Sequence, residues 1–220
     1  AIAKPKDLAG LHIAVTAGPT QEPLDPVRYL TNHSTGKMGY AVARAAAMRG
    51  ADVTLIHGPT ALPPVKFTED VPITTAQDMY EAVTSRFADM DILVMAAAVA
   101  DYRPATVADD KIKKKDGDLS IPVERTADIL GTIGPRKTKQ FLCGFSMETR
   151  DMVENSAAKL KKKNLDMVVA NNLKVSGAGF GVDTNVVTFI TPDGTRELPL
   201  MSKADVADAI LDEILKRRGH

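Results

Sequence analysis

The sequence predicts an α/β fold built on a doubly wound, mostly parallel sheet. Short apolar runs alternate with stretches of helical spacing, and some runs, such as "DILVMAAAV" over residues 91–99, are apolar throughout. Continuous apolar runs are typical of parallel strands buried on both faces, and strand-helix alternation is typical of sheets covered by helices. With 220 residues, 44% of them apolar, the chain is long enough for one large core. We therefore expect a Rossmann-like, three-layer single domain over residues 1–220.

The first half of the chain is expected to form β-α-β-α-β. The strands are predicted at residues 12–18, 51–59 and 91–99, and the helices at residues 35–49 and 77–87. Ser34 or Thr35 is expected to cap the first helix, because a hydroxyl oxygen accepts hydrogen bonds from free helical N–H groups. Gly50 is expected to end it in the left-handed conformation. Residues 1–10 contain no apolar segment and are expected to be a linker.

The second half is expected to add an excursion and then to resume the alternation. A polar, lysine-rich stretch interrupts the pattern over residues 104–125. Further strands are predicted at residues 141–147 and 166–172, helices at 150–163 and 203–217, and a hairpin at 185–200 that turns at Asp193-Gly194. Because a hairpin is antiparallel, we expect it at the edge of the sheet.

Charge and composition exclude several classes of protein. The 28 basic and 28 acidic residues balance, so no overall field would attract nucleic acid or an anionic membrane surface. The longest apolar stretch, residues 92–100, is far shorter than the roughly 20 residues that span a bilayer. Cys143 is the single cysteine, which excludes an internal disulfide framework and fits the reducing cytoplasm where we expect the protein. We expect its side chain to be a small buried hydrophobe and not a reactive thiol.

The unusual loops of the chain all follow predicted strands. They cover residues 18–36, 97–125, 145–148 and 171–185. In doubly wound sheets, ligands bind beyond the carboxyl ends of the strands. These loops are therefore expected to build the ligand site together.

The stretch "NHSTGKMG", residues 32–39, is expected to bind an anion at the start of the first helix. It is not a P-loop, because Thr31 and Met38 stand where that motif needs glycine and Ser or Thr, and Pro19 after Gly18 excludes G-x-G-x-x-G. The free N–H groups and the dipole of a helix N-terminus nevertheless attract phosphate. The residues expected to bind the phosphates of a nucleotide there are Ser34, Thr35, Gly36, Lys37 and Gly39. The alternative is a glycine-rich helix start that packs tightly on the sheet.

The loop before this stretch offers two polar side chains to a second ligand. Three prolines fix its course, and Arg28 and Asn32 could point a guanidinium and an amide at that ligand. A structural network of Arg28 with Glu22 or Asp25 is the alternative.

A third group of candidates follows the central strand. In "AAAVADYRP", residues 96–104, small side chains would let a ligand approach the backbone. Asp101 could bind a ribose hydroxyl or orient a metal-bound triphosphate, or it could cap the following turn. The run "KIKKKDGD", residues 111–118, has on composition alone the character of a solvated charge run.

Four long motifs together resemble one enzyme family. "TAGPTQEPLDPVRYLTNHSTGKMG", "AAAVADYRP", "DDKIKKK" and "KKKNLDMVVANN", in this order and spacing, resemble the phosphopantothenoylcysteine synthetases. More narrowly, they resemble the synthetase half of the bacterial bifunctional coenzyme A biosynthesis flavoproteins, from about Leu11 to the C-terminus. The decarboxylating half that uses FMN is missing, so no FMN is expected in this chain.

The resemblance implies a two-step ligation. The carboxylate of phosphopantothenate attacks the α-phosphate of CTP, giving an acyl-cytidylate and pyrophosphate, and the amine of L-cysteine then displaces CMP. The eukaryotic branch uses ATP. The resemblance also implies Mg²⁺ with the nucleotide, a homodimer with sites near the subunit interface, and fusion to, or association with, a flavin-dependent decarboxylase.

The resemblance also implies roles for individual residues. Asn32 matches the asparagine that holds the acyl-cytidylate, and Lys111 matches the lysine of the first step. Arg28 and the backbone of Ala98 match contacts to phosphopantothenate. The positions that match nucleotide contacts are Met95, Ala96, Ala97, Asp101, Ala127, Asp128, Ile129, Leu130, Phe145, Lys159 and Lys163.

The lysine-rich excursion, residues 104–125, is interpreted as a mobile flap. Its closure would keep water from the activated acyl phosphate. Lys159 and Lys163 are four residues apart on a predicted helix, so both could face one triphosphate, although they would otherwise be ordinary surface charges.

One departure from the family weakens the choice of nucleotide. Thr126-Ala127-Asp128 stands where the family usually has Asn-Pro-Asp. Because proline stiffens a segment, its loss should loosen the contact to the base, so the resemblance supports the reaction better than the preference for CTP.

Two other functions are compatible with parts of the pattern. An NAD(P)-dependent reductase would share the strand-helix alternation but needs an acidic residue at the end of the second strand, where His57 and Gly58 stand. A non-catalytic nucleotide-binding module would not need Asn32 or Lys111. The ring of His33 is expected to make a structural hydrogen bond and not to transfer protons. The ligands of the magnesium ion are not predicted.

Overall fold

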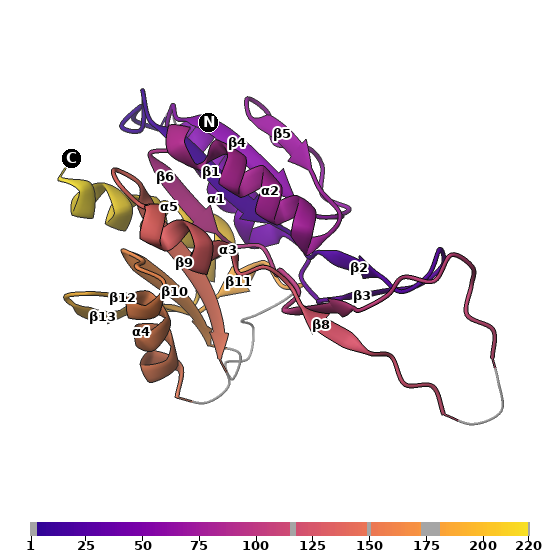
Figure 1. Cartoon of the computed structure of the whole chain (residues 1–220). Coiled ribbons are helices and arrows are strands. Elements are labelled where there is room, and N and C mark those ends of the chain that lie inside the picture. The colour runs from indigo at the N-terminus through magenta and orange to yellow at the C-terminus, as the bar shows by residue number, and fades with distance from the viewer. Residues whose placement is uncertain (1–3, 115–117, 149–150, 173–180, 220) are drawn as a thin grey trace.

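The structure is a computed structural model that describes residues 4–114, 118–148, 151–172 and 181–219. Within these residues, one mixed sheet has the strand order β13-β12-β10-β9-β6-β1-β4-β5 (Figure 1). The six strands from β10 to β5 in this order are parallel, and β12 and β13 are antiparallel. The strands are β1 (His12–Ala17), β4 (Asp52–His57), β5 (Glu69–Pro72), β6 (Ile92–Met95), β9 (Phe141–Glu148), β10 (Met167–Asn172), β12 (Val187–Thr191) and β13 (Gly194–Glu197).

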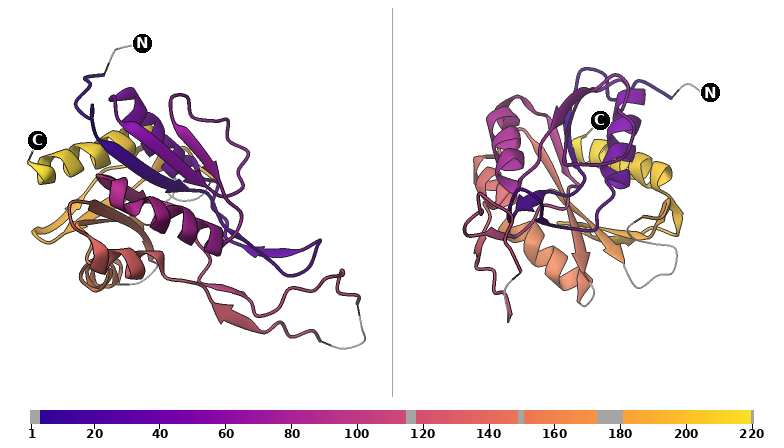
Figure 2. Two further views of the ribbon diagram at one scale, coloured as in Figure 1. Left: turned by 45° about the horizontal axis from the view of Figure 1, so that its top comes forward. Right: turned by 90° about the vertical axis from the view of Figure 1, so that its right-hand side faces the viewer.

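Helices cover both faces of this sheet and complete three layers (Figure 2). One face carries α1 (Lys37–Met48) and α5 (Lys203–Arg218); the other carries α2 (Ala76–Arg86), α3 (Ile129–Ile133) and α4 (Met152–Lys162), with short 3₁₀ turns at Phe87–Asp89 and Gly134–Arg136. Successive side chains of a strand point to opposite faces. Accordingly, Ile13 and Val15 of β1 pack under α1 and α5, and Ala14 packs under the other layer. The predicted doubly wound fold and the edge hairpin are confirmed.

The start of α1 differs from the prediction, and its end does not. The N-cap is Gly36, with φ near +80°, and neither Ser34 nor Thr35 caps the helix with its side chain. The predicted cap was wrong because the chain enters the helix through a left-handed glycine that passes close to the backbone of Gly18. Gly50, with φ near +90°, ends the helix as expected.

Several shorter elements were not predicted, or have other bounds. Strand β5 and helix α3 were missed, since four partly exposed residues and a five-residue helix give almost no periodic signal. Strand β6 ends at Met95 instead of residue 99. The hairpin is confined to residues 187–197, because β11 (Thr184–Asn185) pairs with β14 (Met201–Ser202) beside the start of α5.

Two antiparallel ribbons project from the carboxyl-end edge of the sheet (Figures 1 and 2). One pairs β2 (Gln21–Pro23) with β3 (Tyr29–Thr31), and the other pairs β7 (Tyr102–Pro104) with β8 (Val123–Arg125). We call residues 21–31 and 102–125 together the arm. The predicted flap is the part of the arm beyond the second ribbon, and its described residues extend away from the body without regular structure.

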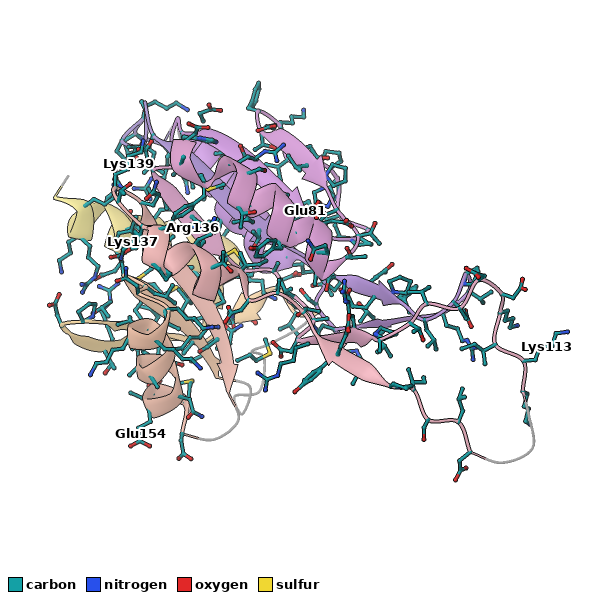
Figure 3. All side chains as sticks on the ribbon, in the orientation of Figure 1. Glu81, Lys113, Arg136, Lys137, Lys139 and Glu154 are labelled. Atoms are coloured by element: carbon teal, nitrogen blue, oxygen red, sulfur yellow. The ribbon has the colours of Figure 1, made fainter. Side chains whose placement is uncertain are left out.

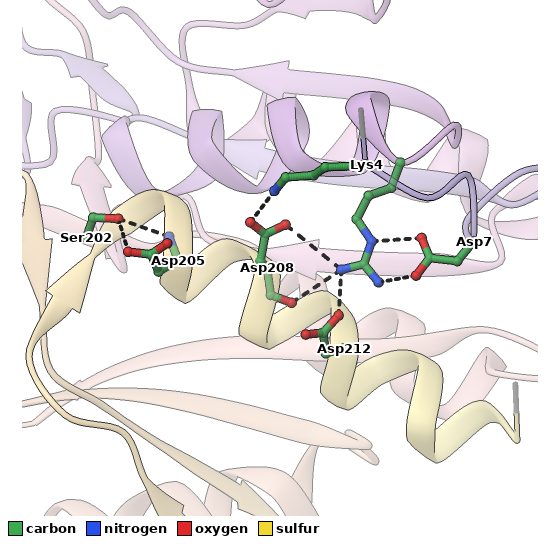
Figure 4. Close-up of polar contacts among 7 residues, drawn as sticks. Lys4, Asp7, Ser202, Asp205, Asp208 and Asp212 are labelled. Carbon is green, nitrogen blue, oxygen red and sulfur yellow. Dashed lines mark hydrogen bonds and ion pairs between the residues drawn. The ribbon is translucent and has the colours of Figure 1, made fainter. Parts of the chain in front are cut away.

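The N-terminal segment, residues 4–10, lies on the body, although the sequence suggested a linker. Leu8 is fully buried, and Lys4 pairs with Asp208 of α5. Asp7 accepts two hydrogen bonds from the guanidinium of Arg49, at 2.9 and 2.6 Å (Figure 4). Arg49 is itself buried and also pairs with Asp212, so a single side chain joins the segment, α1 and α5.

Candidate functional site

Two adjoining cavities lie where the sheet strands end. The larger one, of about 510 Å³, lies between the loop after β6, helix α3 and helix α4. It is lined by Met95, Ala97, Val99, Ala100, Asp101, Tyr102, Arg125, Thr126, Ala127, Asp128, Ile129, Leu130, Phe145, Lys159 and Lys163. Ten of the sixteen residues that the sequence suggested for the nucleotide line this cavity, whereas Ala96 and the five residues at the start of α1 do not.

The smaller cavity, of about 410 Å³, lies over the start of α1. It is lined by Asn32, His33, Ser34, Thr35, Gly36, Lys37, Met38, Gly39, Ala96, Ala97, Ala98, Asp101, Phe145, Ser146, Met147, Asn171, Asn185 and Lys203. Three residues, Ala97, Asp101 and Phe145, line both cavities. Two ligands bound side by side would therefore meet at these three residues.

The larger cavity holds two lysines from one face of α4. Lys159 Nζ donates to the carbonyl of Phe145 at 2.7 Å, and Lys163 forms an ion pair with Asp128. Burial lowers the pKa of Lys163, and the negative charge of Asp101 opposes that shift. Both lysines line this one cavity, and the expectation that they face a triphosphate stays a prediction.

The segment that departs from the family is held in place without a proline. The Thr126 N–H donates to the carbonyl of Asp101 at 3.0 Å, and the Thr126 hydroxyl donates to the carbonyl of Ala100 at 2.6 Å. Asp128 caps α3 by accepting from the Gly131 N–H at 2.9 Å. Side-chain hydrogen bonds on both sides of Ala127 thus restrict the segment that was expected to be loose.

The start of α1 both packs tightly and faces the smaller cavity. A Cβ at Gly39 would lie 2.5 Å from the Cβ of Ala17, so only glycine allows this approach of the helix to β1. The packing alternative for this stretch is therefore correct, and it coexists with a ligand-facing position. Asn32 Nδ2 donates to the carbonyl of Ala98 at 3.0 Å, which brings together two residues that the sequence suggested for the acyl substrate.

Two lysines, Lys37 and Lys203, line the smaller cavity, and the sequence had not suggested Lys203 as a site residue. Lys37 Nζ donates to the Gly181 carbonyl and to Asp183, each at 2.8 Å, so it is a paired cation and not a bare one. Lys203 is buried and donates to the carbonyl of Val182. Burial is the main cause that lowers the pKa of Lys203, followed by the nearby charge of Lys37, while Asp183 opposes the shift.

Sequence reasoning missed other residues of the smaller cavity as well. Asn185 Nδ2 donates to Asn171 Oδ1 at 2.6 Å, and both asparagines are buried. Ser146 shares a buried hydrogen bond of 2.6 Å with Ser156. Asn171 ends a predicted strand and Asn185 lies beyond residues 173–180, which are outside the described residues, so no spacing in the sequence could have paired them.

Arg28 and Lys111 line neither cavity; they belong to the arm. The Arg28 guanidinium donates to Asp25 at 3.0 and 2.5 Å, which is the structural network named as its alternative, whereas Glu22 accepts from the Ala76 N–H instead. Lys111 is exposed on the excursion, two residues before Lys113, which Figure 3 labels at the outer end of the arm.

The remaining reactive groups have ordinary surroundings. Cys143 is fully buried in β9, and burial raises the pKa of its thiol, so it is an inert core residue as expected. The His33 ring is exposed, and the described residues give it no hydrogen bond, in contrast to the expected one. Across the described ranges, no three His, Cys, Asp or Glu side chains gather in a way that could hold a metal ion. None of the described helices is both long and apolar enough to cross a bilayer.

Comparison with known proteins places this geometry in a family. Residues 8–217 match the family described as DNA/pantothenate metabolism flavoprotein C-terminal domain. The chain is 52% identical, over 94% of its length, to the coenzyme A biosynthesis bifunctional protein CoaBC of Bacillus subtilis (strain 168), and 45% identical, over 96%, to that of Escherichia coli (strain K12). It spans about half of these relatives, 52% and 53% of their lengths.

Solved structures agree with the sequence comparison. A crystal structure of the C-terminal domain of CoaBC is 45% identical and superposes with a TM-score of 0.81, covering 94% of this chain and 95% of that one. A Cab2 mutant in complex with phosphopantothenate-cysteine has a TM-score of 0.81 at 18% identity, covering 95% of this chain and 86% of that one. At that identity the second likeness supports the fold alone.

Proposed function

The chain belongs to the family of DNA/pantothenate metabolism flavoprotein C-terminal domains, and on that premise we propose that it ligates phosphopantothenate to L-cysteine through an acyl-nucleotide. The observation that carries the proposal is the pair of cavities that share Ala97, Asp101 and Phe145. A nucleotide in one cavity and an acyl substrate in the other would meet at this shared wall. A passive nucleotide-binding module would not need a second cavity at that place, and a reductase would need an acidic residue where His57 and Gly58 stand.

The proposed chemistry proceeds in two balanced steps. A carboxylate oxygen of phosphopantothenate attacks the α-phosphorus of the nucleotide, the bond to pyrophosphate breaks, and an acyl-nucleotide forms. The amine of cysteine then attacks the acyl carbon, the bond to the nucleoside monophosphate breaks, and an amide forms with loss of a proton from the amine. The first step joins two anions, so it depends on cations and N–H dipoles directed at the phosphoryl group.

The larger cavity is the proposed nucleotide site. Lys159 and Lys163 would face the triphosphate. A phosphate group would then replace Asp128 as the ion-pair partner of Lys163, and it is the stronger anion. Asp101 at the shared wall would contact the ribose or a magnesium ion. Because the described residues offer no ready cluster of ligands, Mg²⁺ would be held mainly by phosphate oxygens and water, as is usual for nucleotide-bound magnesium, and would neutralise phosphate charge.

The smaller cavity is the proposed site of the acyl substrate. Asn32 and the Ala98 backbone lie together at its rim, next to the shared wall, where they would hold the acyl phosphate. The N–H groups at the start of α1 and the two lysines, Lys37 and Lys203, would bind further negative charge. The sequence assigned Ser34, Thr35, Gly36, Lys37 and Gly39 to the nucleotide; because they line the smaller cavity, we propose instead that they bind anionic groups of the acyl substrate.

The arm is proposed to supply the remaining cations and the dimer interface. Lys111 and Arg28 would complete the site for the first step and for phosphopantothenate, and the flap would limit access of water. The arm also carries exposed apolar side chains, among them Val27, Tyr29, Tyr102, Leu119 and Val123. Such a projecting apolar surface supports a homodimer, which sedimentation analysis would detect.

The natural context is proposed from the named relatives. They are bifunctional coenzyme A biosynthesis proteins and about twice as long as this chain. We therefore place the ligase in the cytoplasm, fused to or associated with a flavin-dependent decarboxylase, with FMN bound by that partner and not by this chain.

Two substitutions test the assigned roles. With CTP, phosphopantothenate and cysteine, the wild-type chain should release pyrophosphate and form the amide. Asn32→Asp should slow the second step, so that an acyl-cytidylate can be detected by mass spectrometry, whereas Lys111→Gln should give neither intermediate nor pyrophosphate. The reverse pattern would contradict the roles, and absence of amide with every nucleoside triphosphate would contradict the ligase itself.

The nucleotide preference needs its own measurement. We propose CTP over ATP, and the hydrogen bonds that fix Thr126 support a base-reading segment that is rigid enough to discriminate. The ratio of kcat/KM for CTP and ATP should exceed about tenfold, since one lost hydrogen bond to a base can cost about 1–3 kcal/mol. Equal values for the two nucleotides would reject the preference but not the ligation.

A further inference from the structure

We propose that Asp25 is a positioning residue that fixes the place of Lys111 for nucleotidyl transfer, an inference that rests on the proposed ligase function. Asp25 lines neither cavity, although it lies within the first of the four motifs. It lies at the tip of the first ribbon of the arm, between β2 and β3. Its contacts reach across to the flap, 87 residues further along the chain.

The carboxylate of Asp25 is the centre of a dense set of hydrogen bonds. Oδ1 accepts from the N–H groups of Val27 and Arg28, at 2.9 and 2.8 Å. Oδ2 accepts from Arg28 Nε and Nη2, at 3.0 and 2.5 Å, and from the Ile112 N–H at 3.1 Å. Oδ1 thus stabilises the turn between β2 and β3, and Oδ2 links that turn to the flap.

Both backbone groups of Ile112 are held by this pair of side chains. Its N–H donates to Asp25, and its carbonyl accepts from Arg28 Nη2 at 3.1 Å. A second hydrogen bond joins the ribbon and the flap four residues before Ile112, where the Ala108 N–H donates to the Leu24 carbonyl at 3.0 Å. Lys111 precedes the clamped residue directly, so the clamp restricts where its side chain can reach.

The surroundings of Asp25 require it to stay ionised and paired. Its side chain is inaccessible to solvent, while the Arg28 side chain is 42% exposed. The Arg28 guanidinium, together with the backbone donors, holds the pKa of Asp25 well below its ordinary value despite burial. The clamp therefore remains charged at every pH at which the enzyme would work.

A clamp of this kind fits the need of the first step. Between β7 and β8, the described residues of the excursion form no helix or strand, so no regular structure among them fixes the lysine. Misplacing a catalytic group by about 1 Å can cost roughly 10²-fold in rate. Two hydrogen bonds to the adjacent residue supply the support that a catalytic side chain on a loop otherwise lacks.

The test measures whether Asp25 acts through Lys111. Pyrophosphate release with CTP and phosphopantothenate, without cysteine, would be compared for the wild type, Asp25→Asn, Lys111→Gln and the double variant. We expect Asp25→Asn to slow release about 10²-fold and to leave the dissociation constant for CTP within about twofold. In the Lys111→Gln background, the same substitution should cause no further loss, because the residue it positions is gone.

A matched carboxylate on the same ribbon provides the control. Glu22 is equally buried, but its carboxylate accepts a hydrogen bond from the Ala76 N–H at the start of α2, in the body of the molecule. Glu22→Gln should lower the thermal midpoint and leave pyrophosphate release within about twofold of the wild type. Asp25→Glu, which keeps the charge and moves the carboxylate, should fall between the wild type and Asp25→Asn, and it provides the readout if Asp25→Asn folds poorly.

The outcomes separate this inference from the proposed function. Additive losses in the double variant, or a rate for Asp25→Asn equal to that of the wild type, would overturn the positioning role while the ligase function stands. A wild-type chain that releases no pyrophosphate with any nucleoside triphosphate would overturn both.

Discussion

The body of the molecule and its arm contribute to the proposed site in different ways. At the sheet edge, residues from β6, α3, β9 and α4 converge on one cavity, and they are held by a core that is buried on both faces of the sheet. In the arm, Arg28 and Lys111 lie outside both cavities, supported by a few hydrogen bonds around Asp25. In the proposed site, the body would supply the binding surfaces, and the arm would supply charged groups that few contacts hold.

The difference teaches that stability and catalysis are separable in this chain. Burial of apolar side chains holds the body together, and the projecting arm adds little to that core. The chemistry of the first step, however, needs positive charge at the transferring phosphoryl group. Variants of the body should therefore change stability or binding, and variants of the arm residues that carry or position Lys111 should change the rate.

Removing the flap should have the largest effect on activity. If residues 106–121 are replaced by Asn-Gly, β7 and β8 can still pair through a two-residue turn. Nucleotidyl transfer should fall by about 10³-fold because the lysine is lost, at the upper end of what one stabilising group contributes. CTP binding and the thermal midpoint should change little. A collapse of the midpoint in a thermal melt would show that the arm supports the body after all.

Arg49→Met should have the opposite effect, on stability alone. This buried side chain joins residues 4–10, α1 and α5 through Asp7 and Asp212. Its loss should lower the free energy of unfolding by about 2 kcal/mol, since hydrogen bonds to charged groups contribute about 1.5–3 kcal/mol and the freed carboxylates are hydrated again. Urea denaturation measures the change. The activity of the folded variant should equal that of the wild type, and a matching loss of rate would argue against separate roles.

Lys163→Met should weaken nucleotide binding moderately. Lys163 lines the larger cavity, while Lys161 of the same helix is exposed and lines neither cavity, so Lys161→Met is the matched control. Loss of one cation facing the triphosphate should raise the dissociation constant for CTP about tenfold, or about 1.4 kcal/mol. Calorimetric titration would measure both variants. If Lys163→Met and Lys161→Met bind CTP with equal affinity, the triphosphate does not lie against Lys163.

The smallest effect concerns acid stability of the N-terminal contact. Hydrogen bonds from the Arg49 guanidinium lower the pKa of the Asp7 carboxyl below its ordinary value of 3.8. A lowered folded-state pKa stabilises the fold above the unfolded-state pKa, and the contribution is lost as pH falls through the folded-state value. The stability difference between the wild type and Asp7→Asn should be constant at neutral pH, begin to fall near pH 3.8, and vanish only below the lowered folded-state pKa. A difference that persists at pH 2 would mean that Asp7 does not act through its charge.

Much of the body could be predicted from local pattern. Continuous apolar runs identified the parallel strands, and the rule that ligands bind at their carboxyl ends pointed to the loops that carry Asp101 and Phe145. The resemblance to a family added the lysines of α4, which composition would have left as surface charges. The cap of α1 was predicted wrongly because a left-handed glycine and a hydroxyl side chain are both good helix starts, and only packing against Gly18 decided between them.

By itself, the sequence determined the alternation of strands and helices, the edge hairpin and the loops that carry the site, because these follow from periodicity over neighbouring residues. Only the tertiary structure decided that Lys203 closes the smaller cavity, that Asn171 meets Asn185, and that Asp25 clamps Ile112. These contacts join segments that lie far apart along the chain or on different elements. Their geometry depends on how whole elements pack, and no local pattern records that.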